Sequence, residues 1–124
     1  MTIHEELVKL NKERVRLEKE LAKPGAMVAG AIIQRYTVCG KEGCRCLKGD
    51  RHGPYPALSR PNGQVVYLNR KLHIKISPLV ERYQVFQRDL ANWRRLQKKC
   101  DELYGKLRTE RLIEFEKVKS KLNS

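Results

Sequence analysis

Three cysteines and one histidine lie within the fourteen-residue segment CGKEGCRCLKGDRH, which spans positions 39–52. Their spacing is Cys39-x4-Cys44-x-Cys46-x5-His52. Thiolates and imidazole are the ligands that zinc takes in tetrahedral structural sites. Three thiols are an awkward number for disulfides, but they suit a metal ion that also binds one histidine. The spacing therefore predicts a Zn²⁺ site of the Cys3His type, with Cys39, Cys44, Cys46 and His52 as ligands.

The residues between and next to these ligands suit a short metal-binding loop. Gly40, Gly43, Gly49 and Gly53 allow sharp turns where a Cβ atom would clash. Cationic neighbours would favour the thiolate forms and offset their charge. These neighbours are Lys41, Arg45, Lys48 and Arg51. A small β module has too little core to be stable alone, and zinc ligation, at about 10–16 kcal/mol in finger peptides, could fold it.

Other interpretations of the loop stay open at this stage. The thiols could form a redox device, an iron–sulfur site or a metal-free reduced loop. His73, a water molecule or a second subunit could replace His52 as the fourth ligand. A catalytic zinc needs an open position and a nearby base. Glu42 and Asp50 are the only carboxylates of the loop, and nothing marks either as a base, so we expect no enzyme and assign no catalytic residue.

The chain has 124 residues and a formal net charge of +13, concentrated in its middle. Residues 24–76 contain nine basic and two acidic side chains. Such an excess is self-repelling unless a polyanion relieves it, which favours a nucleic-acid partner, DNA or RNA, over an anionic membrane surface. The longest apolar stretch, Ala26–Ile33, is too short to span a bilayer and follows a charged segment. We expect a cytoplasmic protein with no membrane partner.

The basic side chains of this middle segment are the expected phosphate contacts, and Tyr55 or Tyr67 could pack on a sugar or base. The predicted contacts are Lys41, Arg45, Lys48, Arg51, Tyr55, Arg60, Arg70 and Lys71. A secondary basic cluster would extend this surface along the helix that follows. It consists of Arg94, Arg95, Lys98 and Lys99.

Two helical segments flank the middle of the chain. Residues 1–23 form an amphipathic helix that Thr2 and Glu5 begin as a capping box. Residues 77–124 form a long helix that starts at Ser77-Pro78, with a break predicted near Gly105. Apolar positions in both segments are spaced by three and four, so we expect them to pair as an antiparallel helical hairpin or coiled coil. On this apolar strip, Cys100 should be a buried small hydrophobic side chain.

The middle segment, residues 24–76, reads as a small antiparallel β module. A strand over 31–38 precedes the cysteine loop, and strands over 55–59 and 64–68 flank a hairpin turn at Asn62-Gly63. The predicted fold is therefore α+β, with a zinc-stabilised β module between a short N-terminal helix and a long C-terminal helix. The surplus length of the C-terminal helix could support a homodimer or a protein partner.

The segment also resembles an uncharacterised prokaryotic domain family, found in bacteria and archaea and often encoded near mobile elements. The resemblance covers about residues 25–75. The shared signature is C-G-K-x-x-C-x-C, then H-G-P-Y and L-S-R. In this chain it consists of Cys39, Gly40, Lys41, Cys44, Cys46, His52, Gly53, Pro54, Tyr55, Leu58, Ser59 and Arg60. Family members tend to have an aromatic run after His-Gly-Pro, which Pro56 and Ala57 interrupt here.

Two functions follow from these features. The first is a nucleic-acid-binding protein whose zinc-stabilised basic module contacts the phosphate backbone. The resemblance implies a mobile element as its setting, and an RNA–protein complex is another setting for it. The alternative is an adaptor whose long helix mediates protein–protein association or dimerisation.

Overall fold

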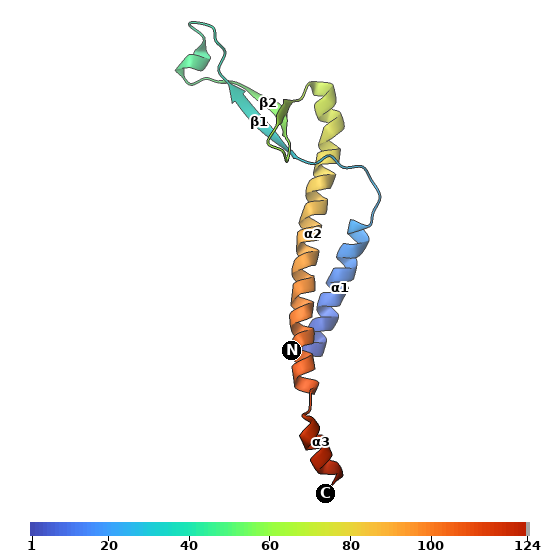
Figure 1. Cartoon of the computed structure of the whole chain (residues 1–124). Coiled ribbons are helices and arrows are strands. Elements are labelled where there is room, and N and C mark those ends of the chain that lie inside the picture. The colour runs from blue at the N-terminus through green and yellow to red at the C-terminus, as the bar shows by residue number, and fades with distance from the viewer. Residues whose placement is uncertain (124) are drawn as a thin grey trace. The chain divides into compact units, whose positions relative to one another are not determined.

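The computed structural model describes residues 1–123 and has the predicted α+β fold (Figure 1). Its elements are α1 (Ile3–Leu21), β1 (Ala31–Thr37), the 3-10 helix η1 (Arg45–Lys48), β2 (His52–Ser59), β3 (Val65–Tyr67), α2 (Arg70–Arg111) and α3 (Phe115–Leu122). The chain divides into two compact units. The helical unit combines residues 1–23 with the chain from Asp89 onward, and the sheet unit is Pro24–Arg88. Across positions 1–123, none of the helices has the length and apolar character needed to cross a membrane.

Helix α1 begins where the sequence predicts. The Thr2 hydroxyl accepts a hydrogen bond from the Glu5 backbone N–H at 3.1 Å, and the Glu5 carboxylate accepts one from the Thr2 backbone N–H at 3.4 Å. This reciprocal capping box satisfies two backbone donors that the helix itself cannot pair. The helix ends at Leu21, shortly before the Pro24-Gly25 pair.

In the helical unit, α1 lies antiparallel to the second half of α2 (Figure 1). Three contacts define the direction, because residue numbers rise along α1 as they fall along α2. Asn11 faces Cys100, Arg14 faces Gln97, and Glu18 faces Trp93. Leu7, Leu17 and Cys100 are buried in this unit, and Cys100 is fully inaccessible, as predicted. The antiparallel arrangement confirms the helical hairpin, whereas coiled-coil packing stays a prediction.

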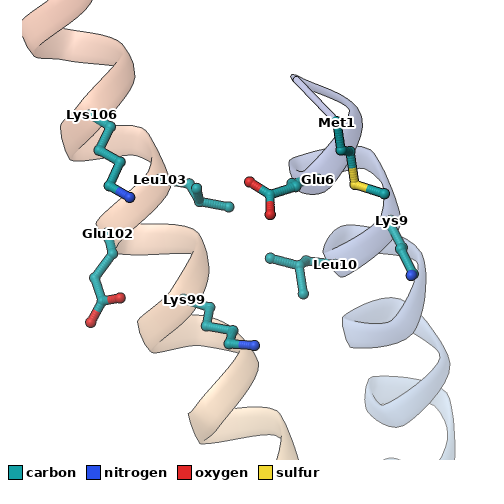
Figure 2. A pocket seen from close by; sticks show the side chains of 8 residues that line it. All are labelled: Met1, Glu6, Lys9, Leu10, Lys99, Glu102, Leu103 and Lys106. Atoms are coloured by element: carbon teal, nitrogen blue, oxygen red, sulfur yellow. The ribbon is translucent and has the colours of Figure 1, made fainter. Parts of the chain in front are cut away.

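A polar contact interrupts the apolar packing of this hairpin. The Arg14 guanidinium donates to the Gln97 side-chain oxygen at 2.8 Å. The three- and four-residue spacing predicts apolar side chains at both positions. The two polar side chains that occur there instead form a hydrogen bond with each other. Further along, Leu10 and Leu103 project into a groove of about 400 Å³ between the helices (Figure 2). Its other lining residues are Met1, Glu6, Lys9, Lys99, Glu102 and Lys106.

The sheet unit contains a three-stranded antiparallel sheet in the order β1-β2-β3. The predicted hairpin joins β2 to β3. The Gly63 backbone N–H donates to the Arg60 carbonyl at 2.9 Å, and Gly63 adopts a φ of 87°. Asn62 supports the turn by accepting a hydrogen bond from the Gln64 N–H at 2.9 Å. A glycine in the left-handed region after a turn is a common hairpin connection.

One face of this sheet packs against the first half of α2. Leu58, Leu68 and Val80 form a buried cluster, against which Ile32 and Ile76 pack. The Gln84 side chain also donates to the Gly30 carbonyl at 2.5 Å, which attaches the start of β1 to the helix. The apolar core of the sheet unit therefore lies between the sheet and the first half of α2.

The start of α2 differs from the prediction. The helix begins at Arg70, and Pro78 lies inside it rather than at its first turn. Asn69 provides the cap, because its side chain accepts a hydrogen bond from the Leu72 N–H at 2.8 Å. Pro78 leaves one carbonyl of the helix without its usual donor. Burial of Val80, on the turn that follows Pro78, favours keeping this stretch helical despite that loss.

The end of α2 also differs from the prediction. The helix continues through Gly105 to Arg111, and the interruption falls at residues 112–114, before α3. One glycine inside a long helix costs only about 1 kcal/mol relative to alanine, which is too little to break it. The Thr109 hydroxyl donates to the Gly105 carbonyl at 3.2 Å and so bonds to the backbone at that point.

Candidate metal centre

The four predicted ligands come together at the end of the β1–β2 hairpin. Cys39 follows β1, and His52 is the first residue of β2, paired in register with Thr37. Cys44 and Cys46 come from the connecting loop, in which Cys44 caps the 3-10 helix η1 and Cys46 lies inside it. In Figure 1 this loop extends beyond the ends of both strands. Cys39 and His52 therefore lie where the two strands end, and η1 brings Cys44 and Cys46 close to them.

The ligand atoms have the separations that a single metal ion needs. His52 Nε2 lies 3.2 Å from Cys44 Sγ and 3.3 Å from Cys39 Sγ. Cys39 Sγ and Cys46 Sγ lie 3.5 Å apart, and all four atoms lie within 4.8 Å of one another. In a tetrahedral zinc site, bonds of 2.0–2.3 Å place the ligands about 3.5–3.8 Å apart. The four side chains could therefore hold one metal ion with small adjustments.

Backbone N–H groups support negative charge on the sulfur atoms. The Cys39 N–H donates to Cys46 Sγ at 3.3 Å. A hydrogen bond from the Lys41 backbone, followed in importance by those from His52, Cys44 and Cys46, lowers the pKa of Cys39 to about 6. Burial raises the pKa of the Cys46 thiol instead. Cys39 is thus the ligand already suited to the thiolate state, and a bound cation would offset the cost of ionising Cys46.

Glycine residues allow the chain to make this loop. Gly43, Gly49 and Gly53 adopt φ values of 76°, 108° and 124°, as predicted, whereas Gly40 is not in the left-handed region. Gly53 has an additional steric role, because a Cβ atom there would lie 2.6 Å from the Arg35 carbonyl oxygen. Only glycine fits this close approach between β2 and β1 without a backbone shift.

The geometry narrows the alternatives that the sequence leaves open. His52 belongs to the cluster found within residues 1–123, and His73 does not. The four cysteines are free thiols, and the 3.5 Å between Cys39 Sγ and Cys46 Sγ is well beyond the disulfide bond length of about 2.05 Å. The arrangement is that of a four-ligand metal site rather than of a closed disulfide.

The predicted phosphate-contacting residues are all exposed and lie in the sheet unit. Lys41, Arg45, Lys48 and Arg51 belong to the cysteine loop. Arg60 lies in the hairpin turn and donates to the Gln64 side chain at 3.0 Å, while Arg70 and Lys71 begin α2. The secondary cluster is also exposed, but it belongs to the helical unit. It consists of Arg94, Arg95, Lys98 and Lys99.

One basic residue of the sheet was not among those predicted. The Arg35 guanidinium lies over the Tyr67 ring, 5.9 Å from its centroid, on the same sheet as exposed Tyr55. Two sequence signals point to this contact in combination. The alternation of β1 assigns Arg35 to one face of the sheet. The Asn62-Gly63 turn fixes the register of β3 against β2, which places Tyr67 on the same face.

Comparison with protein families gives a match over the first half of the chain. The model of DUF6788, a domain of unknown function, matches residues 5–71, which is more than half of the chain. The chain belongs to this family. The expectation of an uncharacterised domain family is thereby confirmed, and the DUF6788 match also includes most of α1, which lies outside the resemblance noted from the cysteine loop. No curated protein and no solved structure matched the chain.

Proposed function

We propose that this protein binds nucleic acid through the phosphate backbone, using the basic surface of its sheet unit. The observation that carries the proposal is the distribution of charge. No acidic residue occurs between Arg51 and Val80, and the only carboxylates of residues 24–76 are Glu42 and Asp50 in the cysteine loop. Among the residues described, none of the seven predicted basic contacts forms an ion pair. Their charge is available to a polyanion.

In this proposal the metal is zinc, and its role is structural. Three thiolates and one imidazole form a ligand set that zinc binds with closed tetrahedral geometry. A closed site has no open position for a substrate or an activated water molecule, so we propose binding rather than catalysis. Zinc would fix η1 against the hairpin and thereby hold Lys41, Arg45, Lys48 and Arg51 in a constant arrangement. Reduced thiols of this kind suit the cytoplasm.

The exposed cluster of Arg94, Arg95, Lys98 and Lys99 would add phosphate contacts from the helical unit. These four positions repeat at spacings of one and four, so they form one continuous stripe on α2. Each phosphate that a basic side chain neutralises releases counterions, and the slope of log affinity against log salt becomes steeper by about 0.9 for duplex DNA. The slope of log affinity against log salt therefore measures how many phosphates the protein neutralises.

The proposal is tested by fluorescence anisotropy with labelled DNA duplex, DNA single strand and RNA single strand over a series of salt concentrations. The test variant carries Arg45→Ala, Lys48→Ala and Arg51→Ala together. A matched control removes three exposed lysines of α1 and has the same net charge. Its substitutions are Lys9→Ala, Lys12→Ala and Lys19→Ala. The loop variant should bind more weakly, with a salt slope smaller by about 2–3, and the control should keep the slope. Equal losses of affinity in both variants would show that binding depends only on net charge. That result would contradict the proposal.

A second candidate function is the adaptor, and one observation favours it. The C-terminal part of the helical unit exposes large apolar side chains, with Leu112, Ile113, Phe115 and Leu122 between 68% and 83% accessible. Contiguous exposed apolar side chains often mark a surface that binds protein. A homodimer or a protein partner through this segment would cover them. Sedimentation velocity would show concentration-dependent association that Phe115→Ser and Leu122→Ser abolish, and a strictly monomeric wild type would exclude the homodimer.

A further inference from the structure

The sheet has two faces of different character, and one of them is covered. Ile32 and Leu58 are paired in register between β1 and β2. Both belong to the apolar core that also contains Leu68 and Val80. Residues paired in register point to the same side of a sheet, so this face is the one that packs against the first half of α2.

The opposite face carries aromatic and basic side chains. Tyr67 is in register with Ala57, and Arg35 is in register with Tyr55. Along the chain, each of these residues lies an odd number of positions from the nearest residue of the apolar core. Because successive side chains of a strand point to opposite faces, all four lie on the face away from the core. The contact between Arg35 and the Tyr67 ring agrees with this assignment.

The aromatic rings on this face are accessible to a ligand. Tyr55 and Tyr67 retain 44% and 52% of their accessible surface, whereas the small Ala57 between them is fully buried. Tyr55 and Tyr67 occupy diagonal positions on adjacent strands, which are about 7–8 Å apart in antiparallel sheets. The face therefore presents the rings of Tyr55 and Tyr67 near the small, buried side chain of Ala57. The Arg35 guanidinium lies over the Tyr67 ring.

The charge around this face suits a polyanion rather than a protein surface of mixed charge. The three strands β1, β2 and β3 contain no aspartate or glutamate. Arg60, directly after β2, and Arg51, directly before it, are exposed at the two ends of the central strand. A ligand lying along the strand would meet a cation at each end and aromatic rings in the middle.

We infer that this face is a stacking platform for unpaired bases, so the ligand is single-stranded nucleic acid. The inference rests on the proposed function and specifies its substrate class. Bases of a single strand stack on Tyr55 and on the side of the Tyr67 ring away from the Arg35 guanidinium, and the flanking arginines contact the phosphates. Stacking on aromatic rings is independent of sequence, because every base has a π face.

Base pairing argues for a single strand over a duplex. In a duplex the faces of the bases are stacked on one another, and no base is free to lie on a tyrosine ring. A duplex could contact the arginines through its phosphates, but it would leave the two rings unused. In OB folds, which also combine basic and aromatic side chains, such surfaces bind about 4–16 nucleotides.

The test measures anisotropy with three probes of about 12 units, all at one salt concentration: oligothymidylate, an abasic deoxyribose-phosphate strand, and a mixed-sequence DNA duplex. Oligouridylate serves as the RNA counterpart. The variants are Tyr55→Leu and Tyr67→Leu, which keep an apolar side chain over Ala57. Tyr36→Leu is the matched control, because Tyr36 is 54% accessible and follows Arg35 in β1, at the register shift and outside the paired positions that form the platform.

Wild-type protein should bind oligothymidylate at least about tenfold more tightly than the abasic strand, since one stacked base contributes about a factor of 5–150. Tyr55→Leu and Tyr67→Leu should each remove much of this preference, and Tyr36→Leu should keep it. Equal affinity for the oligothymidylate and abasic probes, or equal effects of all three substitutions, would overturn the platform and leave phosphate binding intact. No binding to any probe would overturn the proposed function and this inference together.

Discussion

His52 Nε2 lies 3.3 Å from Cys39 Sγ, although the two residues are thirteen positions apart. The β1–β2 hairpin makes this contact, because Thr37 and His52 are paired at its end. Cys44 Sγ lies 3.2 Å from the same nitrogen. An imidazole nitrogen this close to two sulfur atoms is placed as a metal ligand would be. The contact makes His52 the fourth ligand in our account.

The assignment of His52 predicts the result of a cobalt titration. Co²⁺ bound by Cys3His should give the visible absorption of a tetrahedral site together with sulfur charge-transfer bands. His52→Ala should weaken metal binding by about tenfold or more and alter the visible spectrum, because one nitrogen ligand is lost. His73→Ala removes the other histidine of the sheet unit and should change neither. If His73→Ala had the larger effect, the ligand assignment would be wrong.

The lowered pKa of Cys39 predicts its reactivity in metal-free molecules whose loop keeps the arrangement described here. Because the pKa lies at about 6, the thiolate predominates above pH 6 and is lost as the pH falls through that value. An ordinary thiol, with a pKa of about 8.5, is mostly protonated at pH 7. Iodoacetamide at pH 7 should therefore modify Cys39 before buried Cys46, whose pKa is raised. Peptide mass spectrometry gives the order, and faster modification of Cys46 would contradict it.

The close approach at Gly53 predicts a large effect from one methyl group. Gly53→Ala places a Cβ atom 2.6 Å from the Arg35 carbonyl oxygen and forces alanine into the left-handed region. We expect destabilisation by about 1–3 kcal/mol and weaker metal binding, because His52 is the preceding residue. Gly40→Ala is the matched control, since no atom lies within 4 Å of its Cβ position. Thermal melting that ranks Gly40→Ala as the more damaging change would contradict the account.

The contact between Arg14 and Gln97 predicts non-additive substitutions in the helical unit. Gln97→Leu removes the acceptor of a half-buried guanidinium, whose Nε already lacks a hydrogen-bond partner within residues 1–123. It should cost about 1 kcal/mol in the free energy of unfolding. Adding Arg14→Leu should restore most of this loss, because the two side chains would then pack as an apolar pair. Urea denaturation measures the coupling, and additive losses would show that the contact contributes nothing.

Much of the fold follows from local sequence signals. The capping box at Thr2 and Glu5, the Asn62-Gly63 turn and the three- and four-residue spacing of apolar side chains each have one dominant structural solution. The four residues of the candidate metal site could be chosen for a similar reason, since three cysteines and a histidine lie within one short, glycine-containing loop. In each case the information lies within a few residues.

The features that sequence reasoning missed depend on residues far apart in the chain. Pro78 is a helix start by local rules, but Asn69 supplies an earlier cap and the burial of Val80 favours helix on both sides of the proline. Arg35 gains its contact with Tyr67 only when β1 and β3 both pair with β2, which requires two registers to be known at once. Local rules give neither result, because both are set by tertiary packing.

The central claim is that a bound metal ion orders the loop that displays the basic side chains. Hydrogen–deuterium exchange of zinc-loaded and chelator-treated protein tests it most directly. The account predicts one zinc ion per chain and protected amides at Cys39, Lys41 and Leu47, where N–H groups bond within the metal loop. Chelation should release that protection and leave α1 unchanged, because α1 belongs to the helical unit. Identical exchange of residues 39–52 with and without zinc would contradict the claim.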